Sequence, residues 1–363
     1  MIKNLAYLLA LHSVDGLGPA RLKSLLEHFG DDPKLVWEGK IGEIREIGVP
    51  ENVAKLLEET RKKLNPEKYF QEIQDKGIKM LTLFDEEYPK LLKQIYDPPI
   101  ILYYKGEFLP ADDREIGVVG TRKITGYGKL VTEKFTTELV NFGFTIVSGL
   151  ARGVDSVAHL AAINAGGRTI AVLGSGLNNI YPPENIGLAN KITSGQGVVL
   201  SELPPDKTSM PGNFPARNRI ISGLSKAVLV TEAASDSGSL ITARLAIDQG
   251  RDVFAIPGPV TSDLSKGPAD LIKEGARLVF EPKDILEEMG MNPDMSSESR
   301  VQSTLQLSAQ EKLVLEALKN ENKHIDEIGR SLELSAASIS ATLLKMEIQG
   351  LVRNLGGGVY CLT

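Results

Sequence analysis

The segment Thr145-Ile-Val-Ser-Gly-Leu-Ala-Arg-Gly-Val-Asp155 decides the fold that the sequence predicts. Residues 145–148 form an apolar run of strand length, and a glycine-containing loop then leads into a helical pattern. The same order of apolar strand, loop and helix repeats between Glu115 and Phe280. Strands that are apolar on both faces and alternate with helices form parallel sheets covered on both sides. We therefore expect a Rossmann-like open α/β sheet in this region.

The carboxyl ends of the expected strands carry the chemistry. Six apolar runs are the expected strands: Ile116–Val119, Thr145–Ser148, Thr169–Leu173, Val198–Leu200, Ala227–Val230 and Val253–Ile256. Open α/β sheets bind ligands at the carboxyl ends of their strands. Most of the loops that follow these runs are rich in glycine, hydroxyl groups or arginine, which suit close backbone approach and phosphate binding. The loops together predict a site for a polyanion or a nucleotide.

The stretch Phe214-Pro-Ala-Arg-Asn-Arg-Ile-Ile-Ser-Gly-Leu224 carries the strongest functional signal. Pro215 is suited to the first turn of a helix, and Phe214 before it offers a ring for stacking. Arg217 and Arg219, together with the free amides of a helix start, would suit a phosphate. A surface helix with solvated arginines is the alternative interpretation of this stretch by itself.

Other chemistries lack their patterns in this chain. The loop Gly120-Thr-Arg122 does not have the spacing of a dinucleotide-binding fingerprint, and no Walker lysine pattern is present. The four histidines have no metal-ligand spacing, and there is one cysteine. His159 lies in an apolar run, which favours a satisfied histidine at a helix–sheet contact. We find no convincing nucleophile–base arrangement, and therefore expect no metal, no cofactor and no catalytic residue.

The chain divides further on either side of the α/β region. The expected segments are a helical, helix-hairpin-helix or SAM-like domain at 1–64, a connector with short strands at 65–114, the Rossmann-like domain at 115–281, a linker at 282–307 and a winged-helix domain at 308–363. The glycine turn within Val14–Leu26 carries the first assignment, although a helical bundle without DNA contact is its alternative. The last segment holds six Lys or Arg and seven Asp or Glu, so contact with a protein is an alternative to duplex DNA.

Composition excludes several protein classes. The formal net charge of the 363 residues is −6, so a nucleic-acid site must be a local patch. The single cysteine, Cys361, rules out an internal disulfide and fits a reducing compartment. The apolar run Leu5–Leu11 is shorter than a signal peptide or a membrane helix requires. We expect a cytoplasmic protein without a membrane partner.

These motifs, in this order, resemble the DprA/Smf family of DNA-processing proteins. The resemblance rests on the arginine helix, the Ser148–Asp155 loop, Gly-Thr-Arg after the first strand, Ser237-Gly-Ser-Leu-Ile-Thr242 and Gly250-Arg-Asp-Val-Phe-Ala-Ile-Pro-Gly258. It implies a protein without catalytic activity that binds single-stranded DNA and loads the RecA recombinase onto it, notably in natural transformation. It also implies a DNA-binding set, which is Gly120, Thr121, Arg122, Ser148, Gly149, Arg152, Gly174, Phe214, Arg217, Asn218, Arg219, Ser237 and Gly238.

Within that set the resemblance implies roles by residue type. The four arginines would bind backbone phosphates, Phe214 would stack on a base, and the loop residues would add contacts. Some members of the family carry a lysine after the Tyr-Pro of the third loop, where this chain has Pro183-Glu184. The site is therefore expected to be less basic than in those relatives.

The resemblance also implies a homodimer. Its interface would include Leu271, Ile272 and Leu278 at the end of the α/β domain, because an apolar edge strand needs a cover. The alternative is that Ile272 and Leu278 pack inward on their own sheet. The rival function is a nucleotide-metabolising enzyme of the phosphoribohydrolase kind, although the loop that starts at Ser237 does not match the catalytic loop of those enzymes.

Overall fold

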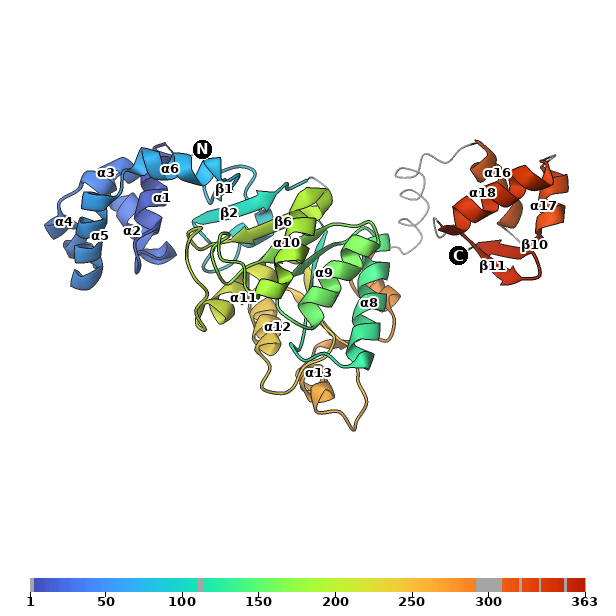
Figure 1. Cartoon of the computed structure of the whole chain (residues 1–363). Helices are drawn as coiled ribbons and strands as arrows, with labels where there is room; N and C mark the ends of the chain where they lie inside the picture. The colour runs from blue at the N-terminus through green and yellow to red at the C-terminus, as the bar shows by residue number, and fades with distance from the viewer. Residues whose placement is uncertain are drawn as a thin grey trace. The chain divides into compact units, whose positions relative to one another are not determined.

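The computed structural model describes residues 3–109, 112, 114–291, 309–319, 322–332, 334–348 and 351–362 (Figure 1). The chain divides into two compact units, Met1–Pro293 and Asp294–Thr363. Among the described residues, no helix is long and apolar enough to cross a membrane.

The first unit is built on a nine-stranded sheet with the order β1-β2-β6-β5-β4-β3-β7-β8-β9. The strands are β1 (Lys79–Thr82), β2 (Ile101–Gly106), β3 (Glu115–Val119), β4 (Thr145–Ser148), β5 (Thr169–Val172), β6 (Gly197–Ser201), β7 (Ala227–Val230), β8 (Asp252–Ala255) and β9 (Arg277–Leu278). Neighbouring strands from β6 across to β9 pair in parallel, whereas β1 and β2 add an antiparallel edge. The expected α/β fold and all six expected parallel strands are confirmed.

The strand order creates a switch point between β3 and β7. The chain leaves β3 toward β4, β5 and β6, and then returns to pair β7 on the other side of β3. The loops that follow β3 and β7 therefore leave the sheet in opposite directions and open a crevice between them. Open α/β sheets place ligands in such a crevice, so the topology itself marks where the site should lie.

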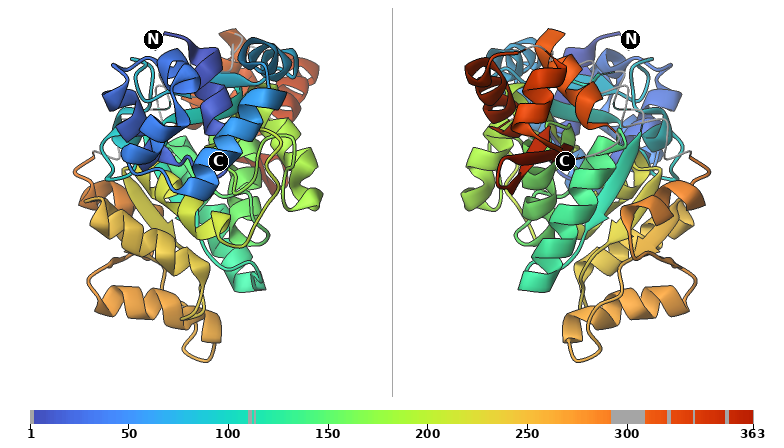
Figure 2. Two further views of the ribbon diagram at one scale, coloured as in Figure 1. Left: turned by 90° about the vertical axis from the view of Figure 1, so that its left-hand side faces the viewer. Right: turned by 90° about the vertical axis from the view of Figure 1, so that its right-hand side faces the viewer.

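Helices cover both faces of the sheet (Figure 2). On one face, α8 (Gly126–Asn141) and α9 (Val154–Asn164) bury Phe135 and Ala158 against Ile116 of β3. On the other face, α11 (Asn213–Leu224) and α12 (Gly238–Asp248) pack on the sheet together with the short helices α7 (Lys90–Lys93) and α13 (Lys266–Lys273). Burial on both faces explains why the parallel strands are apolar throughout.

Six helices precede the sheet: α1 (Leu5–His12), α2 (Pro19–His28), α3 (Pro33–Glu38), α4 (Ile41–Glu46), α5 (Glu51–Lys63) and α6 (Pro66–Asp75). The turn before α2 needs glycine, because Gly16 has φ +92° and a Cβ there would lie 2.7 Å from Val53 Cγ2. These helices share one buried cluster with β2. In it, His12 Nδ1 lies 3.1 Å from the Tyr103 hydroxyl, and burial lowers the pKa of His12 to about 4. The helices, the connector and the sheet thus form one compact unit.

The expected linker boundary at residue 282 is wrong, because a helix of the first unit lies there. Residues Pro282–Glu288 form helix α14, which begins with proline and a capping box between Glu281 and Asp284. Ile285 and Leu286 are buried against the α8 side of the sheet. Breaker residues farther along the chain hid this short amphipathic turn in the sequence. The rest of the expected linker, from 292 to 307, lies outside the described residues.

The second unit has the expected winged-helix order. Its elements are α16 (Ala309–Leu318), β10 (Lys323–His324), α17 (Ile325–Ser331), α18 (Ala336–Ile348), β11 (Val352–Gly356) and β12 (Val359–Leu362), with the strand order β10-β12-β11. Ser335 accepts a hydrogen bond from the Ser338 amide at 3.3 Å and so caps α18, the expected recognition helix. Lys345 of α18 pairs with Glu311 at 2.8 Å, and the Glu311 side chain is only 2 % exposed. Lys345, the only cation of α18, is thus paired with a buried carboxylate of the same unit.

Candidate functional site

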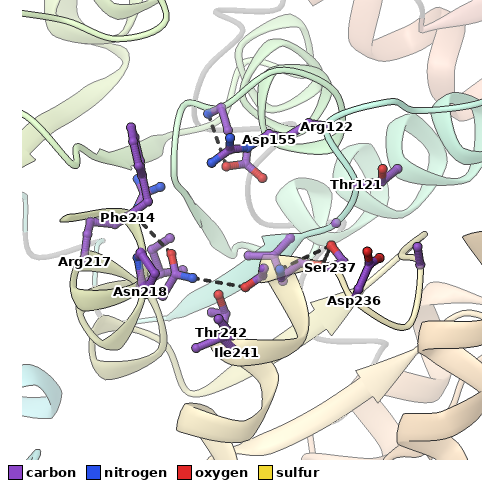
Figure 3. A pocket seen from close by; sticks show the side chains of 18 of the residues that line it. Thr121, Arg122, Asp155, Phe214, Arg217, Asn218, Asp236, Ser237, Ile241 and Thr242 are labelled. Carbon is purple, nitrogen blue, oxygen red and sulfur yellow. Dashed lines mark hydrogen bonds between the residues drawn. The ribbon is translucent and has the colours of Figure 1, made fainter. Parts of the chain in front are cut away.

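A pocket of about 650 Å³ lies at the switch point, at the carboxyl ends of β3 and β7 (Figure 3). The loop after β3 lines one side, the loop after β7 and the start of α12 line another, and α11 lines a third. Figure 3 shows Phe214, Arg217 and Asn218 along one helix, with Asp236 and Ser237 across the pocket from them. The structure thus brings together residues that are more than 100 positions apart in the sequence.

Exposed cations and aromatic rings meet at the pocket mouth. The Arg122 guanidinium lies 5.3 Å from the centroid of the Phe214 ring, within cation–π range. The Tyr181 ring lies 5.7 Å from the same ring. Arg122 and the adjacent Lys123 are exposed, line the pocket and form no ion pair with any described residue. This corner therefore offers free positive charge beside two aromatic faces.

A glycine makes room for the Phe214 ring. A Cβ built on Gly174, in the loop after β5, would lie 2.8 Å from Phe214 Cδ1, which is too close for an unmoved ring. The ring therefore rests directly on the backbone of the loop after β5. Gly174 thus supports the site by its lack of a side chain.

Arg217 is buried and serves the fold. Its side chain points from α11 into the sheet edge, and the residue is 4 % exposed. Its guanidinium donates to the carbonyl of Gly149 at 2.7 Å and, by a shorter contact, to the carbonyl of Val172. Burial lowers its pKa to about 10, so it remains charged at neutral pH. Nε and Nη1 of Arg217 are thus engaged within the protein, which argues against a mainly phosphate-binding role, and the expected phosphate contact stays a prediction.

The loop after β4 is shaped around this buried charge. The Asp155 carboxylate accepts hydrogen bonds from the amides of Gly149 at 3.1 Å and Ala151 at 3.2 Å. Burial raises the pKa of Asp155, and the charge of Arg217 opposes that rise. A Cβ on Gly149 would lie 2.6 Å from the Arg217 guanidinium nitrogens. Gly149 is therefore required for packing under the site. Asp155 also belongs to the site, although the sequence analysis did not select it.

His159 lies in the same buried region, on α9. Its Nδ1 atom pairs with Thr169 Oγ1 at 2.6 Å, at the expected contact between helix and sheet. Its Nε2 atom has no hydrogen-bond partner among the described residues. Burial, aided by the charge of Arg217, lowers the pKa of His159 to about 3. The ring is therefore neutral, and its role is structural.

Arg219 faces away from the pocket. It forms a bidentate ion pair with Glu202, in which Nη1 and Nη2 donate to the two carboxylate oxygens at 2.8 Å and 2.6 Å. Its Nε atom donates to the carbonyl of Asp97 at 3.0 Å. Residues two apart on a helix point to different sides, whereas residues three and four apart share a face. Phe214, Arg217 and Asn218 share the pocket face of α11, so Arg219 cannot. The expectation that Arg219 binds phosphate in this pocket is wrong.

The remaining predicted residues either lie at the rim of the pocket or belong to its frame, by which we mean residues that hold the pocket loops in place. Arg152 is exposed at the rim but forms a short ion pair with Glu184, the residue that departs from the family pattern. The Ser148 hydroxyl is fully buried and donates to the carbonyl of Val118 at 2.7 Å, so it cannot contact a ligand. The expected loop contact of Ser148 is therefore wrong.

The frame residues hold the loops of the pocket in place. The Thr121 amide donates to the carbonyl of Glu232 at 2.6 Å and joins the loop after β3 to the end of β7. Asn218 Nδ2 donates to the carbonyl of Gly238 at 3.2 Å, and Ser237 caps α12. A Cβ on Gly120 would lie 2.6 Å from Val154 Cγ2, so this glycine permits a close approach of α9. These contacts join the loops that line the pocket.

Comparison with known proteins agrees with this arrangement. A model of the DNA recombination-mediator protein A family matches residues 79–290, and a model of the DprA winged-helix domain matches residues 298–358. The chain belongs to this family. It is 38 % identical to Protein Smf of Synechocystis over 98 % of both chains, and 46 % identical to the DNA processing protein DprA of Bacillus subtilis over 59 % of this chain and 72 % of the relative.

Two solved structures of the family resemble this chain. DprA of Streptococcus pneumoniae superposes with a TM-score of 0.68 at 38 % identity, covering 79 % of this chain and 98 % of that one. DprA of Helicobacter pylori superposes with a TM-score of 0.52 at 32 % identity, covering 58 % of this chain and 95 % of that one. The Helicobacter structure describes a single-stranded DNA binding mode of that protein. The family assignment made from the sequence motifs is confirmed.

Besides Asp155, the sequence analysis missed Lys123 and Tyr181, although it recognised the loops that carry them. Lys123 directly follows the Gly-Thr-Arg motif, and Tyr181 lies in the loop after β5 that also supplies Gly174. A cation next to a selected arginine and an aromatic in a selected loop were available signals. Among the described residues, no group of His, Cys, Asp and Glu could hold a metal ion.

The predicted interface residues have different surroundings. Leu271 of α13 is buried in the core beside the sheet, so its assignment to an interface is wrong. Ile272 is half-buried and packs against the same core. Leu278 of the edge strand β9 is 40 % exposed, and the nearby Phe280 is 73 % exposed. The alternative of inward packing therefore holds for α13, while the edge strand keeps apolar side chains on the surface.

Proposed function

We propose that this protein is a recombination mediator that binds single-stranded DNA in the pocket at the ends of β3 and β7. The observation that carries the proposal is the pairing of free Arg122 and Lys123 with the rings of Phe214 and Tyr181. Single strands expose both phosphates and base faces, and proteins bind them with cations and aromatic platforms. The binding mode described for the Helicobacter relative supports the same ligand.

The proposal includes delivery of the bound strand to RecA recombinase, in natural transformation or related recombination. Its support is the family membership of the chain. We also propose a cytoplasmic location, because single-stranded DNA and RecA would be met there. The test is assembly of RecA filaments on DNA already covered by a single-strand binding protein. Faster assembly in the presence of this chain is the expected result, and an unchanged rate would refute the loading role.

We also propose that the protein acts without catalysis. The alternative is a phosphoribohydrolase-like enzyme acting on nucleotides. Incubation of the protein with nucleoside monophosphates separates the two, because release of the free base requires such an enzyme. No base release is expected. Measurable release that depends on the pocket residues would favour the alternative.

The direct test of the binding proposal compares single-stranded and duplex DNA over a series of salt concentrations. We expect tighter binding of the single strand at every salt concentration, with weak dependence on sequence. Paired and stacked bases in a duplex cannot reach the rings of Phe214 and Tyr181, so the duplex loses the stacking contribution. Equal affinity for both forms would contradict this function of the pocket.

Arg122 and Arg45 provide a pair of exposed arginines for the electrostatic part. Arg122→Gln is expected to weaken binding about equally for all sequences and to lower the salt slope by about one, because one phosphate contact is lost. Arg45→Gln on α4 is the control, since Arg45 is not among the residues that line the pocket and its ion pair with Glu51, at 3.7 Å, joins two exposed side chains. Fluorescence anisotropy over the salt series measures both slopes. An unchanged slope for Arg122→Gln would remove this residue from the site.

We propose in addition that the chain forms a homodimer through the edge strand β9. The exposed side chains of Leu278 and Phe280 support it, because an uncovered apolar edge promotes association. Leu278→Glu with Phe280→Glu is expected to give a folded monomer by light scattering and circular dichroism. Leu130→Glu on α8, where the side chain is also exposed, is the control and should not change the mass. A dimer that persists in the double variant would refute this interface.

A further inference from the structure

A second cavity, of about 730 Å³, lies between helix α2 and the loops that follow β1 and α7. We call it the Tyr96 groove, and define it by Gly18, Pro19, Ala20, Arg21, Lys23, Leu83, Tyr96, Asp97, Pro98 and Ile100. Leu83 and Ile100 give it an apolar wall. The Tyr96 ring stands fully exposed at its side.

The free charge in the Tyr96 groove is positive. Arg21 donates one hydrogen bond to the carbonyl of Gly16 at 2.7 Å, and its side chain is otherwise exposed. Lys23 lies 4.0 Å from Glu27, but both side chains are well exposed, so this pair is weak. Asp97 is the acidic member, and Arg219 already pairs with it. An exposed aromatic ring therefore stands beside two available cations.

The groove adjoins the DNA pocket through two shared elements. Arg219 extends from α11, whose other face lines the pocket, to the carbonyl of Asp97 at 3.0 Å. The loop between β6 and α11 lies between the two cavities, because its Pro211 lines the pocket and its Lys207 pairs with Asp15 beside the α2 turn. Both contacts fall within the first compact unit. The two cavities thus belong to one compact unit and are connected through α11 and this loop.

We propose that the Tyr96 groove is a second contact for the same single-stranded DNA, which rests on the proposed function of the pocket. Tyr96 stacks on a base, and Arg21 and Lys23 bind the adjacent backbone. A stacking ring with cations on either side is the arrangement by which proteins bind single strands without reading their sequence. The groove lengthens the footprint of the protein from the pocket toward the helical region.

The test uses the full chain and two oligothymidylates, one of about 6 and one of about 30 nucleotides, chosen to fill one contact or both. Tyr96→Ala is expected to weaken binding of the long oligonucleotide about 5-fold or more, as lost stacking, and to leave the short one unchanged. Arg21→Gln with Lys23→Gln should do the same and also reduce the salt slope for the long one alone. Lys55→Gln with Lys62→Gln, two exposed cations of α5, is the matched control.

A photo-crosslink gives an independent readout. A long oligonucleotide with iododeoxyuridine should form an adduct at Tyr96, in addition to adducts at the rings of the pocket. Adducts confined to Phe214 and Tyr181 would overturn the inference. Unchanged affinity for the long oligonucleotide in both groove variants would overturn it as well. Either result is the one expected if the groove binds a protein in place of DNA. If the unaltered chain binds neither oligonucleotide, the proposed function fails, and this inference fails with it.

Discussion

Replacing Arg217 with methionine is expected to lower the free energy of unfolding by about 3 kcal/mol. The side chain is buried, and it holds the carbonyls of Gly149 and Val172 at the ends of two neighbouring strands. Methionine has a similar length but no donor, so these carbonyls would remain buried without their donor. A buried polar group that loses its partner costs about 1–3 kcal/mol, and the carboxylate of Asp155 also loses a compensating charge.

Denaturant unfolding of the full chain, followed by circular dichroism, measures this change. Arg244→Met on α12 is the matched control, because that arginine is exposed. Its Nη2 atom lies 4.0 Å from Glu274 Oε1, so the ion pair between these two exposed side chains is weak. The control should change stability by less than about 0.5 kcal/mol. The Arg217→Met chain, where folded, should keep the salt slope for DNA. A stable variant with a reduced slope would show that Arg217 binds phosphate after all.

The position of the site was predictable from the sequence, because two regularities of α/β proteins combine. Apolar runs alternate with helices, so the sheet had to be parallel and its carboxyl ends had to share one edge. Gly120 after β3 and Ser237 after β7 were therefore expected on the same edge of the sheet, and the strand order then brings them together. The structure places them in the same pocket.

The roles of the individual arginines were not predictable in the same way. The spacing of a helix shows that Arg217 and Arg219 point to different sides, but it does not show which side meets the pocket. Tertiary packing decides this, because Ile220 and Leu224 of α11 must face the sheet. Glu202, which neutralises Arg219, comes from the end of β6, and no local pattern connects the two. The same holds for Arg152, whose partner Glu184 belongs to the next loop.

The buried charges explain why so many predicted ligand contacts became frame contacts. Arg217, Asp155 and Ser148 satisfy backbone groups at the ends of β3, β4 and β5. Loops that leave a parallel sheet at one edge expose many amides and carbonyls, and those that are buried need partners. A polar motif in such a loop therefore has two possible uses. Only burial distinguishes a residue that supports the pocket from one that meets the ligand.

Replacing Phe214 with alanine is expected to weaken binding of single-stranded DNA by about 1–3 kcal/mol with little change in the salt slope. The ring is half-buried, rests on Gly174 and lies beside both Arg122 and Tyr181. Its loss removes a stacking surface but no charge, so the number of phosphate contacts stays the same. Anisotropy titrations over the salt series measure the affinity and the slope together.

Two further variants make this test specific. Gly174→Ala keeps the ring but places a methyl group 2.8 Å from Phe214 Cδ1, so the ring must move and affinity should fall in the same direction. Phe108→Ala is the matched control, because Phe108 is also half-buried against a tyrosine, Tyr104, but follows β2 at the opposite end of β6. It should bind DNA normally. If Phe214→Ala and Phe108→Ala bind equally well, the ring of Phe214 does not stack on a base, and the cations alone hold the strand.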